Sequence, residues 1–223
     1  MITIDGPAGA GKSTAARALA DRLGYRLVDT GAMYRALAWS VARVGLGGPG
    51  IPIEDTPALR RHLASVDVVL AGDRVLVDGQ DVTGEIRTRE ISDLTSRLTM
   101  LGPVRDRVTP LQRQMATGGG VVLEGRDTGT VVCPDADVKF YLDASDEARA
   151  RRRQRELAAR GTVVDLETVR REIDLRDRQD TTRALAPLRK APDAITVDTT
   201  DLDVDQVVEL MQRAIERQCC TRS

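Results

Sequence analysis

Two periodicities of apolar residues alternate along the chain. Short apolar runs bounded by turn residues predict five buried strands, at residues 1–5, 26–29, 118–125, 138–144 and 194–200. Apolar side chains at helical spacing predict helices at residues 12–23, 30–41, 89–101, 145–160 and 203–215, with others starting at residues 56 and 103 and after the Gly161–Thr162 break, the last running to about residue 180. Strands that alternate with helices predict a five-stranded parallel sheet with helices on both faces.

Several predicted helix ends carry local signals. Gly24 is expected to end the first helix, and Thr30 is expected to be the N-cap of the second. The Thr56–Pro57 pair has the composition of a further helix start, a capping hydroxyl followed by proline. Pro110 is expected to kink or break the helix that begins at Pro103, because proline has no N–H to donate.

The pattern changes within residues 65–84, which read SVDVVLAGDRVLVDGQDVTG. Apolar and polar residues alternate there, and turn residues stand at 71–73 and 78–79. This pattern predicts a small antiparallel hairpin or three-stranded sheet. Because it interrupts an alternation of strands and helices, we interpret it as an insert.

Composition limits the classes of function. A chain of 223 residues is long enough for one α/β domain with small inserts. Its 33 basic and 34 acidic residues nearly cancel, and only 2% of residues are aromatic, which disfavours nucleic-acid binding. Only three of the basic residues are lysines and asparagine is absent, a bias typical of GC-rich coding sequences. Clusters of arginine therefore carry little information by themselves.

Cysteine and histidine offer no metal or disulfide framework. Cys133, Cys219 and Cys220 are odd in number and form no C-x-x-C pair, which fits a reducing compartment. The single histidine, His62, has no second ligand nearby, so we expect a surface residue. Apolar runs are too short to cross a bilayer and no signal peptide precedes the first strand, so we expect a cytoplasmic protein.

The segment GPAGAGKST follows the first predicted strand and leads into the first helix. Its glycine, lysine and serine spacing is that of a phosphate-binding loop (P-loop), in which backbone N–H groups and a helix N-terminus surround phosphate oxygens. Lys12 can reach the β- and γ-phosphates, and the Ser13 hydroxyl can bind Mg²⁺ directly. The sequence therefore predicts that a nucleoside triphosphate with Mg²⁺ is bound by Gly6, Pro7, Ala8, Gly9, Ala10, Gly11, Lys12, Ser13 and Thr14.

The acceptor of the phosphoryl group is indicated by a later strand. No N/T-K-x-D segment for reading guanine occurs, which disfavours a GTPase. The strand that ends VVLEGRD places Glu124 where a Walker-B acid would stand. Arg126 and Asp127 follow at the carboxyl edge of the sheet, where α/β proteins bind small ligands.

With these residues in view, the sequence resembles the bacterial cytidylate kinases, a family of nucleoside monophosphate kinases. The matching stretches are ITIDGPAGAGKST, VDTGAMYRALA, DVTGEIRT, EGRDTGTVV with PDADVKFYLDAS, and RDRQDTTRALAPL. They extend from residue 2 to about residue 200, and DTGAMYR and GRDTGTVVCPDA are the most specific. The resemblance implies ATP-dependent phosphorylation of CMP and dCMP in pyrimidine nucleotide metabolism.

The resemblance also implies a layout and a set of site residues. The expected core is residues 1–30, 103–148 and 190–223, with a nucleotide-monophosphate-binding region carrying the β insert at 31–102 and a helical lid at 149–189, mobile at about 151–165. Arg152 and Arg153 of the lid would cover ATP. The acceptor nucleotide would be surrounded by Thr30, Tyr34, Arg35, Ser96, Arg105, Arg126, Asp127, Arg176, Asp180 and Arg183. Ala8 stands where some members carry serine, and Glu124, expected to contact Mg²⁺ through water, replaces a more usual aspartate.

The expected chemistry needs no general base, because a nucleoside monophosphate already carries an anionic oxygen nucleophile. Catalysis then consists of positioning and charge neutralisation, which suits Lys12, Arg126 and Arg183 as catalytic residues and Arg35 as a phosphate ligand. Asp127 can only accept hydrogen bonds, so it would favour the amino group of cytosine over the carbonyl of uracil. Arg105 would donate to the cytosine ring, and Ser96 would adjust the fit.

Two other hypotheses remain at this point. One is a different small-molecule P-loop kinase, of the shikimate or dephospho-coenzyme A type. The other, less favoured, is an arginine-rich nucleic-acid-binding protein that uses ARARRRQRELAAR to contact phosphates. The expected partners are ATP, CMP and dCMP, with no nucleic acid or membrane. We expect a monomer, because no heptad repeat or long apolar surface stripe is visible.

Overall fold

The chain forms two compact units in the computed structural model. The structure describes the backbone of residues 1–159 and 161–221, and the side chains of residues 1–159 and 161–218. Unit 1 comprises Met1–Leu27 and Gly118–Ser223, and unit 2 comprises Val28–Thr117. The side chains of Cys219 and Cys220 and the last residue of the predicted helix 145–160 lie outside the described residues.

A five-stranded sheet organises unit 1. Its strands follow the order β2-β6-β1-β7-β8, and the pairs β1–β6, β1–β7 and β7–β8 are parallel. The bounds are β1 (Ile2–Asp5), β2 (Arg26–Asp29), β6 (Val121–Glu124), β7 (Val138–Asp143) and β8 (Ile195–Asp198). β1 and β6 are buried at every position, as expected for central strands of a parallel sheet. All five predicted strands are confirmed.

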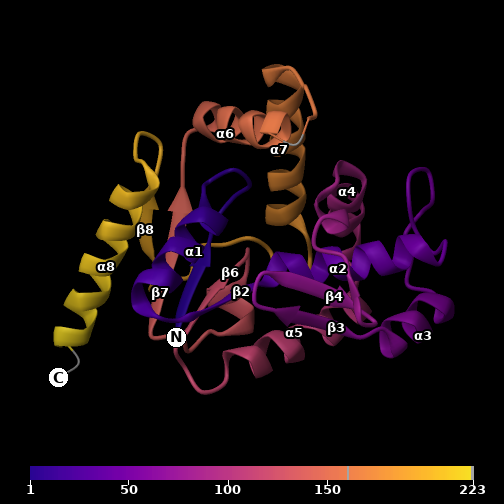
Figure 1. Ribbon diagram of the computed structural model, residues 1–223, viewed down its shortest axis with the longest axis horizontal. Helices are drawn as coiled ribbons and strands as arrows, with labels where there is room; N and C mark the ends of the chain where they lie inside the picture. Colours follow the sequence, from indigo (N-terminus) through magenta and orange to yellow (C-terminus); the bar gives the residue numbers. More distant parts are fainter. Residues whose placement is uncertain (160, 222–223) are drawn as a thin grey trace. The chain divides into compact units, whose positions relative to one another are not determined.

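Helices α1 (Lys12–Leu23) and α8 (Val204–Thr221) pack against this sheet and against each other. Leu19 of α1 and Met211 of α8 are fully buried in one core with Phe140 of β7. Gly24 ends α1 with a φ of +65°, a conformation that favours glycine. In Figure 1, α8 runs beside β8 at the edge of the sheet.

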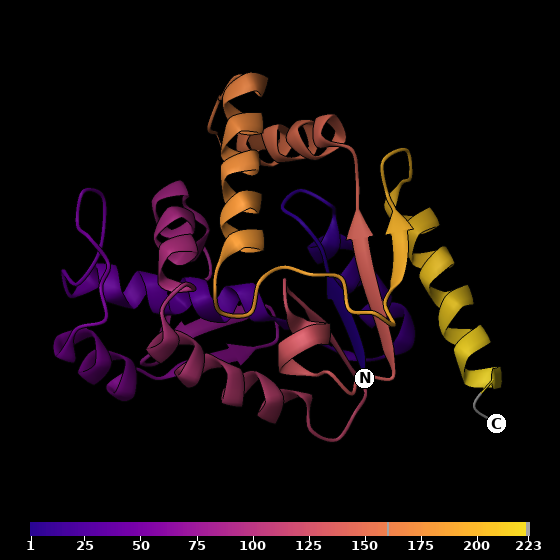
Figure 2. The same cartoon turned by 180° about the vertical axis from the view of Figure 1, so that it is seen from behind.

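The carboxyl edge of the sheet carries a helical hairpin made of α6 (Asp146–Ala159) and α7 (Leu166–Thr182). Figure 1 shows α6 leaving the tip of β7, at the edge where the loop after β1 also emerges. Asp165 caps α7 by accepting a hydrogen bond from Thr168 N at 2.9 Å. After α7 the chain returns through residues 183–194 to β8, as Figure 2 shows. The two helices and the break at Gly161, with φ +78°, match the prediction.

Unit 2 contains a three-stranded antiparallel sheet with helices around one core. The sheet consists of β3 (Val68–Ala71), β4 (Arg74–Val77) and β5 (Gln80–Asp81), in that order. The helices are α2 (Thr30–Arg43), α3 (Pro57–Ser65), η1 (Glu85–Arg87), α4 (Arg89–Leu98) and α5 (Gly102–Ala116). Leu37, Leu94 and Val104 bring α2, α4 and α5 into this core. The predicted insert is therefore a three-stranded sheet, and the fold class is confirmed.

Three local predictions require correction. Asp29, not Thr30, is the N-cap of α2, because its carboxylate accepts a hydrogen bond from Ala32 N at 2.8 Å. Pro110 does not break α5, which continues to Ala116; Pro110 is exposed, so water can donate to the carbonyl left without a partner. The helix predicted to reach residue 101 ends at Leu98.

His62 is half-buried rather than a surface residue. Its Nε2 lies 3.0 Å from Ser40 Oγ, so it links α3 to α2. Among the residues that the structure describes, no group of three or more histidine, cysteine and acidic side chains could hold a metal ion. No described helix has both the length and the apolar character needed to cross a membrane.

Candidate active site

The phosphate loop, defined here as Gly6–Thr14, bends tightly between β1 and α1. Gly6, Gly9 and Gly11 have φ values of +147°, +75° and +81°, which favour glycine. A Cβ at Gly6 would lie 2.0 Å from the Leu142 carbonyl oxygen, so this position has no room for a side chain. The backbone of the loop therefore lies close to the neighbouring strand β7, and the loop leads directly into the N-terminus of α1, a location that favours anion binding.

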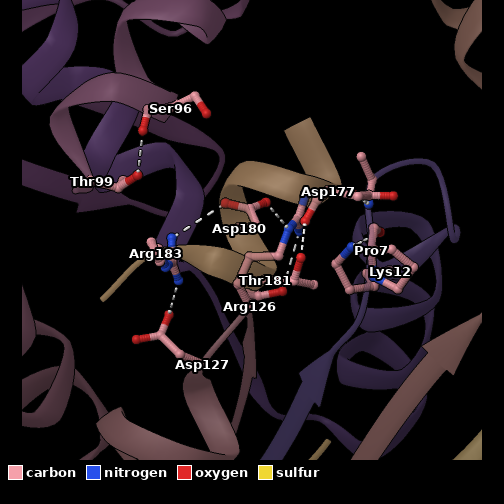
Figure 3. Close-up of polar contacts among 12 residues, drawn as sticks. Pro7, Lys12, Ser96, Thr99, Arg126, Asp127, Asp177, Asp180, Thr181 and Arg183 are labelled. Atoms are coloured by element: carbon pink, nitrogen blue, oxygen red, sulfur yellow. Dashed lines mark hydrogen bonds and ion pairs between the residues drawn. The ribbon is translucent and has the colours of Figure 1, made fainter. Parts of the chain in front are cut away.

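Lys12 is buried under this loop. Its Nζ donates a hydrogen bond to the Pro7 carbonyl at 2.6 Å (Figure 3). Burial, together with the positive charges of Arg126 and Arg176, lowers the pKa of Lys12 to about 7, and the Glu124 carboxylate opposes this shift. An anionic phosphate beside Nζ would favour the charged form. The site is therefore electrostatically prepared for a polyanion.

Ser13 and Glu124 meet at the carboxyl ends of β1 and β6. Ser13 Oγ donates to Glu124 Oε2 at 2.9 Å, and Glu124 is buried. Magnesium in nucleotide sites is typically held by one or two protein oxygens, with waters and phosphate oxygens completing the octahedron. The Ser13 hydroxyl and the Glu124 carboxylate, which lie within hydrogen-bonding distance of each other, fit that donor set.

Asp5, the last residue of β1, holds the segment after β6 in place. Its carboxylate accepts hydrogen bonds from Thr128 N at 2.9 Å, Thr128 Oγ1 at 2.8 Å and Gly129 N at 2.8 Å. Burial raises the pKa of Asp5, although these hydrogen bonds oppose the rise. The segment Thr128–Val132 forms a single π-helical turn, a feature often found at functional sites. Asp5 therefore orients the residues directly after Asp127.

Arg126, Asp127, Asp180 and Arg183 form one network, drawn in Figure 3, in which Arg126 is half-buried and the other three are buried. Asp180 Oδ2 accepts from Arg126 Nε at 3.0 Å, and Asp180 Oδ1 accepts from Arg183 Nη1 at 3.3 Å. Arg183 also reaches Asp127 Oδ1 at 3.5 Å through Nη2 and the Ala186 carbonyl at 2.8 Å through Nε. The structure thus gathers four of the predicted site residues, from the segment between β6 and the π-helical turn, from α7 and from the residue that follows α7.

Electrostatics keeps this network charged. Burial alone would raise the pKa of Asp180, but the guanidinium groups of Arg126, Arg176 and Arg183 outweigh it and lower the pKa. Burial opposes the charged form of Arg126, yet Asp180 and Asp177 raise its pKa above the ordinary value. Two guanidinium groups fixed by one carboxylate form a preorganised positive site of the kind that binds phosphate.

The two arginines predicted to cover ATP have different surroundings. Arg152 Nη1 donates to Thr199 Oγ1 at 2.8 Å, Nη2 donates to the Thr199 carbonyl, and a Cβ at Gly11 would lie 3.7 Å from Nη1. Arg152 therefore lies beside the phosphate loop. Arg153 pairs with Glu156 at 3.0 Å, one helical turn along α6.

Unit 2 contains the other predicted acceptor residues except Arg176, which lies on α7 in unit 1. Arg105 is buried, with its guanidinium carbon 5.7 Å from the centroid of the Tyr34 ring, a cation–π contact between α5 and α2. Arg105 Nη1 donates to the Thr99 carbonyl at 3.4 Å, and Thr99 Oγ1 donates to the Ser96 carbonyl at 2.9 Å. Tyr34, Ser96 and Arg105 are thereby connected within this unit.

Arg35 is held by the residue that caps its own helix. Arg35 Nη2 donates to Asp29 Oδ2 at 2.8 Å, and Arg87 lies 3.9 Å from the same oxygen. A Cβ at Gly31 would lie 3.0 Å from Arg35 Nη1, so glycine leaves space for this pair. Thr30 is buried at the first turn of α2. The DTGAMYR stretch thus fixes the direction of one arginine.

Sequence reasoning missed the residues that support the site: Asp5, Asp29, Arg149, Asp177 and Thr199. Asp29 and Asp177 each stand close to a predicted arginine, at VDTGAMYR and RDRQD, a signal that local pairing could have used. Asp5, at the end of β1, gave a weaker signal as a charged residue closing a buried strand. Arg149 and Thr199 lie far in sequence from the loop that they contact, at Ala8 and Ala10, so only the fold reveals them.

Comparison with known proteins relates the sequence of this chain to one family. A sequence profile described as cytidylate kinase matches residues 2–217. The chain is 48% identical over 220 residues to the cytidylate kinase of Geobacter sp. (strain M21), covering 97% of this chain and 92% of that protein. It is 51% identical over 215 residues to the cytidylate kinase of Pelotomaculum thermopropionicum, covering 94% and 93%.

Among solved structures, an uncharacterized protein from Eubacterium ventriosum ATCC 27560 aligns over 97% of each chain with a TM-score of 0.52. At 13% sequence identity this likeness concerns the fold alone. The sequence matches extend over nearly the whole chain, through the phosphate loop, the GRDTGTVV segment and the α6–α7 hairpin. The chain therefore belongs to the cytidylate kinase family.

Proposed function

We propose that this protein transfers the γ-phosphoryl group of ATP to CMP and dCMP, giving ADP with CDP or dCDP. The observation that carries the proposal is the pairing of a phosphate loop containing buried Lys12 with the Arg126–Asp180–Arg183 network in the same unit, within a chain of the cytidylate kinase family. The first arrangement suits a triphosphate donor. The second suits the phosphate of a small acceptor.

The donor side consists of the phosphate loop and its neighbours. The phosphate loop Gly6–Thr14 would bind the phosphates of ATP through backbone N–H groups other than that of Ala8, which donates to Asp177, and Lys12 would bridge the β- and γ-phosphates. Arg152, and more distantly Arg153, would add positive charge from α6. Ser13 would bind Mg²⁺ directly and Glu124 through water, in line with their 2.9 Å contact; when bound, Mg²⁺ supplies charge neutralisation to the phosphates.

The acceptor side requires positioning rather than proton transfer. A phosphate oxygen of CMP forms a bond to the γ-phosphorus while the bond from that phosphorus to the β,γ-bridging oxygen breaks, and ADP leaves with the electron pair. Arg126 and Arg183 would bind the CMP phosphate and the group in transfer. Arg35, Arg176 and Thr30 are proposed as further ligands of the acceptor nucleotide.

Base selection is assigned to Asp127, Ser96, Arg105 and Tyr34. Asp127 accepts hydrogen bonds only, so it favours the amino group of cytosine and disfavours the carbonyl of uracil. In the structure its carboxylate is 8% exposed and is paired with Arg183, which orients it. Asp180 and Arg176 are proposed to lie near the sugar. The protein is further proposed to act as a monomer in the cytoplasm.

Steady-state kinetics with several acceptors tests the proposal. ADP formation is measured with Mg·ATP and, separately, CMP, dCMP, UMP, AMP and shikimate. We expect rapid turnover with CMP and dCMP, a much lower kcat/KM with UMP, and slow ATP loss without an acceptor, because a closed site excludes water. Turnover of shikimate in preference to CMP, or the same rate of ATP loss with and without CMP, would contradict the proposal.

A further inference from the structure

At the tip of the phosphate loop, Ala8 forms backbone hydrogen bonds with side chains of the α6–α7 hairpin. Its N–H donates to Asp177 Oδ1 of α7 at 2.9 Å, and its carbonyl accepts from Arg149 Nη1 of α6 at 3.1 Å. Arg149 and Asp177 also form an ion pair with each other. Both backbone polar groups of Ala8 are therefore satisfied by one pair of side chains from two helices.

Apolar packing reinforces this attachment. The Ala8 side chain is 8% exposed and belongs to a cluster with Ala150 and Leu157 of α6 and Val169 and Ile173 of α7. This cluster is the core of the helical hairpin itself. The tip of the loop is thus part of the interior of the hairpin, not a separate turn that the hairpin covers.

Gly9 shows how closely the loop and α6 approach. A Cβ at Gly9 would lie 2.8 Å from the Arg149 carbonyl oxygen and 3.0 Å from Arg149 Cβ. Any side chain at residue 9 would push the loop away from α6. Arg149 is also anchored on its other side, where Nη2 donates to Asp146 Oδ1 at 2.6 Å. The Arg149 guanidinium is therefore oriented by Asp146 as well as by its contact with the loop.

We propose that Arg149 and Asp177 are positioning residues that clamp Ala8 and thereby fix the nucleotide-binding conformation of the phosphate loop to the α6–α7 hairpin. Neither residue needs to touch ATP. Displacing α6 and α7 would release both backbone groups of Ala8, so the hairpin and the donor site change together.

Kinetics can separate this role from general stability, and this readout rests on the proposed function. In Arg149→Gln and Asp177→Ala we expect the KM for ATP to rise about 10- to 100-fold, the effect of misplacing a binding loop by about 1 Å, with the KM for CMP changed less than threefold. Arg149→Lys, which keeps one charged donor, should recover part of the loss. The matched control is Arg151→Gln, on the same helix, which removes the same charge from an exposed pair with Glu147 and should leave both KM values unchanged.

Amide hydrogen exchange tests the clamp without any catalytic reaction. In the parent protein the Ala8 amide should exchange at least tenfold more slowly than in Asp177→Ala, measured by NMR at one pH and temperature, with Arg151→Gln matching the parent. If Asp177→Ala does not fold, Asp177→Asn replaces it, because asparagine keeps an acceptor for the Ala8 N–H. In Asp177→Asn the Ala8 amide should exchange faster than in the parent, but by a smaller factor than expected for Asp177→Ala. Equal exchange rates of the Ala8 amide in the parent and in Asp177→Ala, or equal rises in the KM for ATP and for CMP, would overturn the clamp. If the Ala8 amide of the parent exchanges as slowly as expected but the parent does not phosphorylate CMP, only the proposed function is contradicted.

Discussion

Asp180 lies between two guanidinium groups, accepting from Arg126 at 3.0 Å and from Arg183 at 3.3 Å. Its carboxylate is buried, and so is Arg183. Two like charges are thereby held close together by one opposite charge. Such a group is stable because the carboxylate is present, and it holds the two guanidinium groups in orientations that suit a phosphate ligand.

Asp180→Asn should therefore weaken both folding and catalysis. Removing one partner of a buried ion pair typically costs about 3–5 kcal/mol of the free energy of unfolding, and loss of arginine orientation should lower kcat/KM for CMP about 10- to 100-fold. Denaturant unfolding and steady-state kinetics measure the two effects. Asp205→Asn, which breaks an exposed pair with Arg22 at 2.5 Å, is the control and should change stability by less than about 1 kcal/mol.

The stability difference should also depend on pH. The pKa of Asp180 is below its ordinary value of 3.8 in the folded protein, so its contribution is fully present above 3.8 and is lost as pH falls through the folded pKa. The difference between parent and Asp180→Asn should thus be constant near neutral pH and shrink below pH 3.8. A difference that grows on acidification would contradict the assignment.

Asp127 is expected to select the base. Asp127→Ala should lower kcat/KM for CMP about 10- to 100-fold, the size of a bidentate base contact of about 1–3 kcal/mol, and should reduce the preference for CMP over UMP. Asp135→Ala, an exposed carboxylate in the same segment of chain, is the control and should match the parent. If Asp127→Ala phosphorylates CMP as efficiently as the parent, another group reads the base.

Lys12 should take up a proton when ATP binds. Its pKa of about 7 in the free protein leaves it mostly neutral at pH 8, and the phosphates should restore its charge. Calorimetry in buffers of different ionisation enthalpy should give an uptake of about one proton per ATP at pH 8 and little at pH 6. Lys12→Arg keeps a permanent positive charge, so ATP binding to this variant should occur without proton uptake. The same heat in every buffer at pH 8 would show that Lys12 is already charged.

Gly6 should tolerate no side chain. Gly6→Ala combines an unfavourable φ of +147° with a contact of 2.0 Å to the Leu142 carbonyl, so we expect a loss of about 3 kcal/mol or more in the free energy of unfolding, or loss of ATP binding. Gly24→Ala is the matched control, because its φ is also positive at +65° but its Cβ meets no atom within 4 Å. That variant should lose about 1–2 kcal/mol and bind ATP normally. Equal losses would mean that the close approach of Gly6 to β7 does not matter.

Local patterns in the sequence were sufficient to predict the sheet and most helices. Strands β1, β6, β7 and β8 are short segments rich in apolar residues and bounded by turn residues, and α8 has a clear apolar face, so local patterns identify them. The errors occur where competing local interactions decide the outcome. Asp29 replaces Thr30 as N-cap because an adjacent carboxylate competes for the same N–H groups, and Pro110 is accepted within α5 because it is exposed.

Site residues within recognisable motifs could be predicted, but their supports could not. The phosphate loop and the GRD segment follow a strand directly, so their chemistry is local in sequence. Asp5 and Gly129 are 124 residues apart, and Ala8 and Asp177 are 169 apart. Contacts of such separation depend on strand order and helix packing, which periodicity does not specify.

The most direct test of the account is to identify the product. ³¹P NMR of a reaction containing Mg·ATP and CMP should show the resonances of ATP replaced by those of ADP and by the α- and β-phosphates of CDP, with no inorganic phosphate in excess of slow hydrolysis. Conversion of ATP to ADP and inorganic phosphate, with the CMP resonance unchanged, would contradict phosphoryl transfer to a nucleotide.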